Sequence, residues 1–511
     1  MRHLGDWTSY WAQRSPEAVA LDEPVTKRRW TYRDLDRRAN RLAHALAARC
    51  GVGRGDRVAV LAHNRGEQFE ALFACAKLGA LFAPLNWRLA PAELDGVLAD
   101  ADPKVLFCDR ACAPLAAALC TPVPARFAYD EPAAGGEPYE ALVGAASDRA
   151  AGSPEVSLED ALVLLYTSGT SGKPKGALLA HRQLLFNSLC TQLAVGLSPA
   201  DSTLVFLPLF HTGGLNCLAT PLLHQGGRVV ILPAFDAEQT LAVTAAERIT
   251  LVMGVPTIFQ MWREAPSFAR ADLSAVRSAL VGGAPSPLPL IDAYRARGVL
   301  FRQGYGLTEV GPNCFSLVPD DAFRKAGSIG WPNFYLEARV VDDDGRDVAD
   351  GAIGELALAG PMVTLGYFRN PDATAQAFRG GRFFHTGDLV RRDDEGYHTV
   401  VDRKKEMFIS GGENVYPAEI EQALAALDGL AEVCVIGVPD ERWGEVGRAV
   451  AVRRPGAALE TRAVLAFLDG KLARYKIPKS VVFTDALPRN PAGKVVRPTV
   501  KERFGRGAKN S

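Results

Sequence analysis

Apolar residues in the first part of the chain, from about residue 30 to 290, alternate between two periods. The segment TYRDLDRRANRLAHALAA (31–48) repeats them at helical spacing, with Thr31 in an N-cap position. Continuous runs such as DRVAVLA (56–62), TLVFLPL and TLVMGVP predict buried strands instead. Short apolar strands separated by helices are typical of parallel sheets with helices on both faces. The pattern therefore predicts an α/β fold.

Beyond about residue 325 the pattern changes. The segment GSIGWPNFYLEARVVDDDGRDVADGAIGELALAG (327–360) has short alternating strands and an acidic turn, which predicts a small antiparallel sheet. A charged run at 402–406 follows strand YHTVV, and helix PAEIEQALAAL, strand EVCVIGV and helix TRAVLAFLDGKL come after it. We predict a large N-terminal domain over 1–401, built of parallel α/β subdomains and an antiparallel β unit. A boundary at 402–406 then precedes a smaller α+β domain over 407–511.

Composition is that of a globular protein and argues against some functions. The 511 residues are 48% hydrophobic, and Lys+Arg and Asp+Glu are both 58, so the formal net charge is zero. A chain without a basic excess is a poor general nucleic-acid binder. We find no signal-peptide run and no segment of the ~18 apolar residues that a membrane helix needs. The nine cysteines are scattered without CxxC spacing, which favours free thiols and a cytoplasmic protein.

The stretch YTSGTSGKPKG (166–176) has the composition of a phosphate-binding loop. Its glycines let backbone N–H groups approach an anion closely, and its hydroxyl and lysine side chains add donors and charge. The spacing is not that of a Walker A loop, because Gly169 and Gly172 are three residues apart and Pro174 follows Lys173. A solvated glycine–serine turn between two strands is the alternative.

Further motifs follow this loop, and together they resemble a known family. GYGLTE (304–309), HTGDL (385–389), DRKKEMFISGGENVYPAEIE (402–421) and PRNPAGKVVR (488–497) stand in the order found in the adenylate-forming superfamily. That superfamily contains acyl-CoA synthetases, nonribosomal adenylation domains and firefly-type luciferases. The resemblance runs from about residue 5 to 505 and implies two steps. A carboxylate attacks the α-phosphate of ATP to give acyl-AMP and pyrophosphate, and CoA then displaces AMP.

The resemblance assigns many of these motif residues to ATP and its metal. Those implied in ATP or AMP binding are Thr167, Ser168, Gly169, Thr170, Ser171, Gly172, Lys173, Lys175, Gly283, Ala284, Pro285, Gly304, Tyr305, Gly306, Thr308, Asp388, Arg403 and Lys494. Thr167 and Glu309 are implied as ligands of Mg²⁺, and Asp388 as the partner of the ribose hydroxyls. Each short motif also has a structural alternative, since TGD is a common turn and GYGLTE can be a glycine-containing strand end.

The catalytic residues that the resemblance implies are Lys494, Thr308, Glu309 and His211. In relatives the lysine at position 494 serves adenylation only. It moves away when the small domain turns about a hinge, whose position here is Lys405. The resemblance therefore implies that residues 407–511 form a mobile domain. Residues matching CoA contacts in some relatives are Arg88, Gly411, Gly412, Trp443 and Lys479, each of which also suits a surface charge, a turn or a packing aromatic.

The acid is predicted to bind behind FHTGGLNCLATPLL (210–223), in a pocket formed by His211, Gly213, Gly214, Val255 and Gly282. This segment offers neither an aspartate for a substrate ammonium nor a Lys or Arg for a second carboxylate, which favours an uncharged tail. The first hypothesis is a medium- or long-chain fatty acyl-CoA synthetase. The alternatives are a CoA ligase for a cinnamate- or benzoate-like acid and a stand-alone adenylation enzyme that loads a carrier protein. Oligomeric state and peripheral membrane contact are left open by the sequence.

Overall fold

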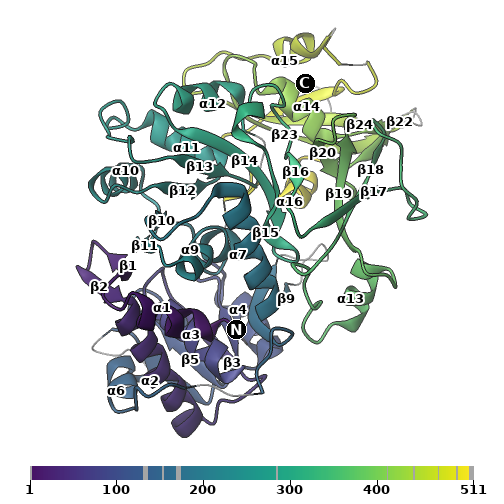
Figure 1. Ribbon diagram of the computed structural model, residues 1–511. Coiled ribbons are helices and arrows are strands. Elements are labelled where there is room, and N and C mark those ends of the chain that lie inside the picture. The colour runs from purple at the N-terminus through teal and green to yellow at the C-terminus, as the bar shows by residue number, and fades with distance from the viewer. Residues whose placement is uncertain are drawn as a thin grey trace. The chain divides into compact units, whose positions relative to one another are not determined.

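The computed structural model describes residues 3–130, 136–151, 155–167, 174–283, 286–410, 413–440, 443–469, 471–472, 474–490 and 493–505 (Figure 1). The chain divides into two compact units. The first contains residues 1–338 and 358–384, and the second contains residues 339–357 and 385–511. The division into compact units does not show how the units move, so the hinge at 402–406 stays a prediction.

One sheet of the first unit has the strand order β16-β15-β14-β13-β12-β10-β11-β1-β2. Its strands are β1 (Val19–Glu23), β2 (Arg28–Thr31), β10 (Ser202–Val205), β11 (Arg228–Ile231), β12 (Leu251–Gly254), β13 (Ser278–Val281), β14 (Leu300–Leu307), β15 (Gly311–Ser316) and β16 (Trp331–Pro332). Strands β10 to β14 are parallel, as their apolar runs predict. Strand β16 comes from the segment predicted to form the small antiparallel sheet, but it pairs with β15 in the large sheet instead.

The other sheet of this unit has the order β7-β6-β5-β3-β4-β8-β9. Its strands are β3 (Arg57–Leu61), β4 (Leu81–Pro84), β5 (Val105–Cys108), β6 (Ala125–Ala128), β7 (Glu137–Pro138), β8 (Ala161–Thr167) and β9 (Lys175–Ala180). The strands from β7 to β8 run parallel, while β9 pairs antiparallel with β8. The two faces of β3 belong to separate apolar clusters, with Val58 and Val60 in one and Ala59 and Leu61 in the other. Burial on both faces explains why these strands are continuously apolar.

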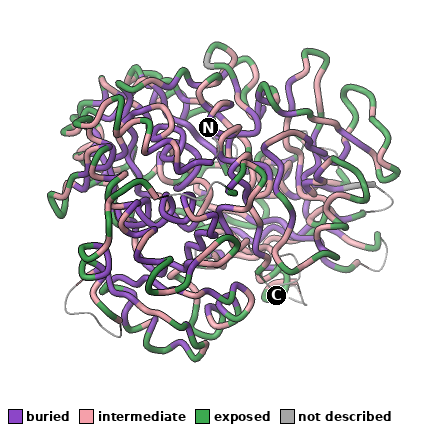
Figure 2. Tube along the Cα trace, turned by 60° about the horizontal axis from the view of Figure 1, so that its bottom comes forward, coloured by how far each residue is buried: buried purple, intermediate pink, exposed green. Residues whose placement is uncertain are grey.

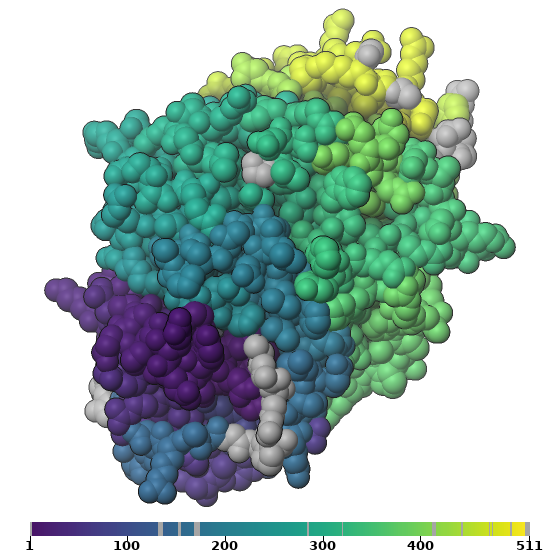
Figure 3. Space-filling view, in the orientation of Figure 1, coloured from purple at the N-terminus to yellow at the C-terminus, as the bar shows by residue number. Residues whose placement is uncertain are grey.

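The helices of the first unit are α1 (Gly5–Arg14), α2 (Tyr32–Cys50), α3 (Glu67–Leu78), α4 (Pro91–Ala101), α5 (Ala113–Ala117), α6 (Tyr139–Gly144), α7 (His181–Val195), α8 (Thr212–Asn216), α9 (Ala219–Gln225), α10 (Ala237–Ala246), α11 (Pro256–Glu264), α12 (Leu288–Arg295) and α13 (Pro371–Phe378). The short 3-10 helix η1 covers Pro319–Asp321. Thr31 caps α2 through a capping box with Asp34, which confirms the predicted N-cap. Part of the N-terminal segment, dark purple in Figure 3, lies on the surface. The buried ring of Trp7 stacks on His224, with ring centroids 4.2 Å apart. Within the described chain, no helix combines the length and apolar character needed to cross a bilayer.

The second unit contains two sheets and the helices α14 (Pro417–Leu424), α15 (Thr461–Leu468) and α16 (Arg497–Phe504). The antiparallel sheet has the order β17-β18-β19-β20, from β17 (Glu337–Val341), β18 (Ile353–Ala359), β19 (Phe384–Arg392) and β20 (His398–Arg403). The second sheet has the order β22-β21-β24-β23 with β25 beside β24, from β21 (Phe408–Ser410), β22 (Glu413–Val415), β23 (Leu430–Asp440), β24 (Gly444–Arg453) and β25 (Ser480–Phe483). Most residues of β3, β10, β18 and β24 are buried, and Figure 2 draws buried residues in purple. The predicted fold class, parallel α/β sheets with an antiparallel unit and an α+β part, is confirmed.

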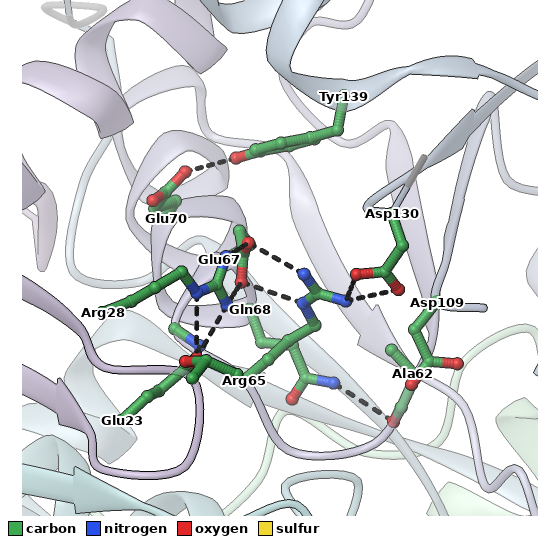
Figure 4. A network of polar contacts seen from close by, with 12 residues as sticks. Glu23, Arg28, Ala62, Arg65, Glu67, Gln68, Glu70, Asp109, Asp130 and Tyr139 are labelled. Carbon is green, nitrogen blue, oxygen red and sulfur yellow. Dashed lines mark hydrogen bonds and ion pairs between the residues drawn. The ribbon is translucent and has the colours of Figure 1, made fainter. Parts of the chain in front are cut away.

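A buried ion network joins β2 to the start of α3 in the first unit (Figure 4). The carboxylate of Glu67 accepts hydrogen bonds from Arg28 and from Arg65, which also donates to Asp130. One turn later the carboxylate of Glu70 accepts a bond from Tyr139. Although burial alone would raise it, the hydrogen bonds and charges of Arg65 and Arg28 lower the pKa of Glu67 to about 2 from its usual 4.5.

Glu67→Gln is therefore expected to destabilise the protein by about 3–5 kcal/mol near neutral pH, because it removes a buried carboxylate that pairs with two partly buried guanidinium groups. The lowered pKa of Glu67 corresponds to about 3 kcal/mol of stabilisation. Since this pKa is depressed in the folded state, the stabilisation is complete above pH of about 4.5 and is lost as the pH falls toward about 2. Urea unfolding at several pH values measures both effects. The control is Glu140→Gln, whose carboxylate pairs with Arg38 at the surface and is expected to cost less than about 1 kcal/mol. Equal losses in the two variants would contradict the assignment.

Candidate active site

Several predicted site residues lie at one edge of the large sheet of the first unit. Strands β10, β12, β13 and β14 are parallel, so the residues at and just beyond their carboxyl ends share that edge. These residues are His211, Val255, Gly282, Gly283 and the 304–309 segment. A Cβ added at Gly282 would meet the carbonyl of Gly304 at 3.7 Å, and one at Gly283 would meet Val255 at 3.5 Å. In open α/β sheets the carboxyl edge is where ligands bind.

Two glycines of the predicted site are required by close packing of the backbone. A Cβ at Gly306 would lie 2.1 Å from the carbonyl oxygen of Pro312, across the β14–β15 pair. A Cβ at Gly214 would lie 2.4 Å from the carbonyl oxygen of Pro208. Only glycine fits such approaches. Gly213 differs, because its nearest contact would be Leu207 at 4.0 Å, so this position borders free space.

His211 occupies the N-cap position of α8 and carries a buried polar atom. Its Nε2 is buried and has no hydrogen-bond partner among the described residues. Burial, with a smaller contribution from the positive charge of Arg88, lowers the pKa of His211 to about 4. The imidazole is therefore neutral at neutral pH, and its buried nitrogen is available for a substrate group.

Trp87 and Arg88 follow the carboxyl end of β4 and approach the segment that precedes α8. The Arg88 guanidinium lies 4.8 Å from the centre of the Trp87 ring and 6.0 Å from that of Phe210. Burial lowers the pKa of Arg88 from its usual value. These contacts place a cation and two aromatic rings beside His211.

The base of the predicted phosphate loop is a regular antiparallel pair. Thr167 of β8 lies opposite Lys175 of β9, and the Tyr166 hydroxyl donates to Asp100 at 2.6 Å. The strand predicted after the loop is thus confirmed, with no helix in the place that a Walker A loop would need. Predicted residues that lie outside the described chain are Ser168, Gly169, Thr170, Ser171, Gly172, Lys173, Ala284, Pro285, Gly411 and Gly412.

Tyr367 connects the base of this loop to Glu309. Its hydroxyl donates to the carboxylate of Glu309 at 2.9 Å, and the Lys175 ammonium lies 5.3 Å from its ring centre. The backbone carbonyl of Glu309 also accepts a hydrogen bond from Thr364 N–H at 2.7 Å. The sequence analysis missed Tyr367, since nothing in GYFRNPDAT marks this ring as a partner of a carboxylate 58 residues away.

In the second unit the structure brings Asp388, Arg403 and Lys494 together. Asp388 of β19 lies opposite Arg403 of β20, and the Arg403 Nε is 2.5 Å from the Asp388 carboxylate. Lys494 is exposed, yet its pKa lies below the usual value because nearby protein displaces water from its ammonium and Arg403 repels it. The carboxylates of Glu406 and Asp388 oppose this shift. The arrangement is a small cationic group around one buried carboxylate.

The predicted hinge region has its own charged contacts in this unit. Lys404 pairs with the buried carboxylate of Glu355 at 3.1 Å and with Asp343 at 2.6 Å. Burial, together with repulsion from Arg403, lowers the pKa of Lys405. Burial also raises the pKa of Asp402 to about 6, although its carboxylate accepts the backbone N–H of Ala418 and Arg403. The ammonium of Lys404 is thus stabilised by two ion pairs, whereas the surroundings of Lys405 disfavour its charged form.

The predicted CoA residues fall in both units. Trp443 is 42% exposed just before β24, and Lys479 donates its backbone N–H to the carbonyl of Gly447 just before β25. Arg88 belongs to the first unit. This set therefore stays a prediction.

Comparisons with known proteins agree with these motifs. The family model described as AMP-binding enzyme matches residues 8–368, and the model described as AMP-binding enzyme C-terminal domain matches residues 419–494. The chain is 43% identical to a feruloyl-CoA synthase from Amycolatopsis sp, over 98% of this chain and 99% of the relative. It is 44% identical to an indoleacetate–CoA ligase from Aromatoleum aromaticum, over 98% of each chain.

A solved structure described as a Mycobacterium tuberculosis fatty acyl CoA synthetase is 35% identical, with a TM-score of 0.79 over 98% of each chain. The two family models match parts of both units, and the feruloyl-CoA synthase covers 98% of the chain. The chain belongs to the AMP-binding enzyme family.

Proposed function

We propose that this chain converts an aromatic carboxylic acid to its CoA thioester by way of an acyl-AMP. The chain is an AMP-forming carboxylic acid–CoA ligase, because relatives that match nearly its whole length are CoA ligases. In the first step a carboxylate oxygen attacks the α-phosphorus of ATP and pyrophosphate leaves. In the second the CoA thiolate attacks the acyl carbon and AMP leaves.

Positive charge on this chain is the main requirement of the first step, which brings two anions together. Lys175, at the base of the phosphate loop, is assigned to the β- and γ-phosphates, and Thr308 to the α-phosphate. Asp388 accepts hydrogen bonds from the ribose hydroxyls, and its partner Arg403 keeps the carboxylate in place. Lys494, close in space to both, neutralises charge as it develops at the α-phosphate.

The donors near the phosphate loop suit Mg²⁺. Thr167 and Glu309 offer hydroxyl and carboxylate oxygens, the hard ligands that this ion prefers. The hydrogen bond from Tyr367 orients the Glu309 carboxylate, and the Lys175 ammonium lies 5.3 Å from the centre of the same tyrosine ring. We assign Mg²⁺ to Thr167 and Glu309, where it would neutralise phosphate charge when ATP is bound.

An aromatic acid is favoured over the fatty acid of the first hypothesis. The relatives that act on feruloyl and indoleacetyl groups share 43% and 44% of their residues with this chain, against 35% for the fatty acyl CoA synthetase. His211 is neutral and Gly213 borders free space, which suits an uncharged ring beside the carboxylate. A fatty acid is the second candidate, because the fatty acyl CoA synthetase structure matches 98% of the chain. The cytoplasmic location and peripheral membrane contact stay predictions.

A panel of acids separates these candidates. AMP release is measured for hydroxycinnamic, arylacetic, benzoic and straight-chain fatty acids, each with CoA, without CoA and with a phosphopantetheinyl carrier protein. We expect hydroxycinnamic or arylacetic acids to give the highest kcat/KM, with multiple turnover only when CoA is present. A preference for fatty acids would reverse the substrate assignment, and turnover with the carrier protein alone would make this an adenylation partner.

Gly213→Leu tests where the acid binds. A leucine here adds bulk to the free space beside His211, so kcat/KM for the preferred acid is expected to fall by about 10–100-fold while KM for ATP stays unchanged. The control is Gly96→Leu in α4, where an added Cβ also meets nothing within 4 Å. If Gly213→Leu left the acid profile unchanged, the pocket would lie elsewhere.

A further inference from the structure

The smaller parallel sheet of the first unit has its own ligand-binding edge. Strand β3 lies between β5 and β4, so the chain leaves β3 toward one side for β4 and then crosses to the other side for β5. The apolar clusters show the result, since α3 shares a cluster with Val58 and Val60, and α4 shares one with Ala59 and Leu61. Such a reversal of strand order opens a crevice beyond the carboxyl ends of the strands.

Three side chains with metal-binding atoms converge at this reversal. His63 follows β3, while Asp109 and Cys112 follow β5. The His63 Nδ1 lies 3.1 Å from an Asp109 carboxylate oxygen and 3.9 Å from the Cys112 sulfur, and all three atoms lie within 4.8 Å of one another. Asp109 and Cys112 are 6% and 2% exposed, whereas the His63 side chain is 26% exposed. The cluster is therefore enclosed by protein and open to solvent at the histidine.

We propose that His63, Asp109 and Cys112 form a binding site for a thiophilic divalent cation such as Zn²⁺. In a tetrahedral zinc site, bond lengths of about 2.0–2.3 Å place neighbouring ligand atoms about 3.3–3.6 Å apart. The two distances in this cluster bracket that range. Three protein ligands with a fourth position left open are one known form of such a site.

The surroundings hold the ligands in place before any ion binds. Asp109 accepts the backbone N–H of His63 and that of Cys112, both at 2.8 Å, which fixes the two loops relative to each other. The His63 ring nitrogen also lies within hydrogen-bond distance of the same carboxylate. Asp109 is thus held in one orientation before any ion binds, as a ligand must be.

Binding requires one proton to leave. A cysteine binds a metal ion as the thiolate, so the Cys112 thiol must lose its proton when the ion binds. A bound cation replaces the thiol proton, which passes to solvent, and the His63 ring takes the tautomer with its proton on Nε2. The carboxylate and thiolate together balance the charge of the divalent ion.

Cobalt(II) is a suitable probe, because thiolate ligation produces an intense near-ultraviolet charge-transfer band and tetrahedral geometry produces strong visible bands. The full-length reduced protein is titrated with Co²⁺ and the ion is then displaced with Zn²⁺. We expect both sets of bands to rise to an equimolar endpoint and to vanish when zinc is added. The exposed acidic turn Asp393–Glu395 has no sulfur and cannot give the charge-transfer band.

Variants assign the band to these residues. Cys112→Ser is expected to abolish it, whereas Cys120→Ser, at an exposed free cysteine, is expected to leave it unchanged. His63→Gln, at the more exposed ligand, keeps the thiol and is expected to weaken binding by at least ~10-fold. If the wild type gave no thiolate band, or if the band survived in Cys112→Ser, the cluster would be only a hydrogen-bonded loop anchor and the proposal would fail.

Discussion

Lys494→Ala is expected to slow acyl-AMP formation by about 10²–10³-fold and to leave the transfer of supplied acyl-AMP to CoA within about threefold of wild type. The reason is the different charge demand of the two steps. Negative charge grows at the α-phosphate only when the carboxylate attacks ATP, and Lys494 is close in space to Asp388 and Arg403, which we assign to the nucleotide. In the second step the nucleophile attacks the acyl carbon, away from the phosphorus.

Pyrophosphate release measures the first step, and disappearance of the CoA thiol in the presence of acyl-AMP measures the second. Lys501→Ala is a matched control, since this exposed lysine of α16 lies in the same unit and pairs only loosely with Glu445 at 3.2 Å. The control should leave both steps at wild-type rates. Equal loss of both steps in a folded Lys494→Ala variant would show that the lysine does not serve adenylation alone.

Glu309→Gln is expected to lower ATP–pyrophosphate exchange by at least ~10²-fold and to shift its Mg²⁺ dependence to higher concentration. Glutamine keeps the oxygen that accepts the hydrogen bond from Tyr367, so the local structure should persist while the charge is lost. The measurement is exchange of labelled pyrophosphate into ATP over a series of Mg²⁺ concentrations.

Tyr367→Phe tests the orientation of the Glu309 carboxylate separately from its charge. It removes the hydroxyl that donates to Glu309 but keeps the ring beside Lys175. The expected loss of exchange is smaller, about 10-fold, because the carboxylate remains and is only less well held. Glu309→Gln with wild-type exchange at every Mg²⁺ concentration would remove Glu309 from the metal site.

Local pattern determined much of the fold. Apolar runs at β3, β10 and β12 predicted buried strands, and Thr31 predicted the N-cap of α2. These features are readable because the burial period of an element and the chemistry of its ends are written in neighbouring residues. The phosphate-loop stretch and the later motifs also predicted the family, since each motif is contiguous and its order along the chain is visible.

Contacts between residues that are far apart in the sequence became visible only in the tertiary structure. Trp331 and Pro332 read as part of the small antiparallel sheet, yet they extend the large one, because strand pairing depends on which edge is exposed and not on local pattern. The same holds for Tyr367, which finds Glu309 only because its segment runs beside β9.

The predicted phosphate loop and the cluster of His63, Asp109 and Cys112 differ in the same way, since only the first can be recognised from the sequence. The sequence alone predicted that the 166–176 stretch binds phosphate, because its glycine, hydroxyl and lysine residues lie within one contiguous segment. It gave no sign that His63 meets a carboxylate 46 residues away, or that Cys112 approaches the same ring. That convergence follows from the order β5-β3-β4, and strand order is fixed by packing and crossover direction over the whole sheet.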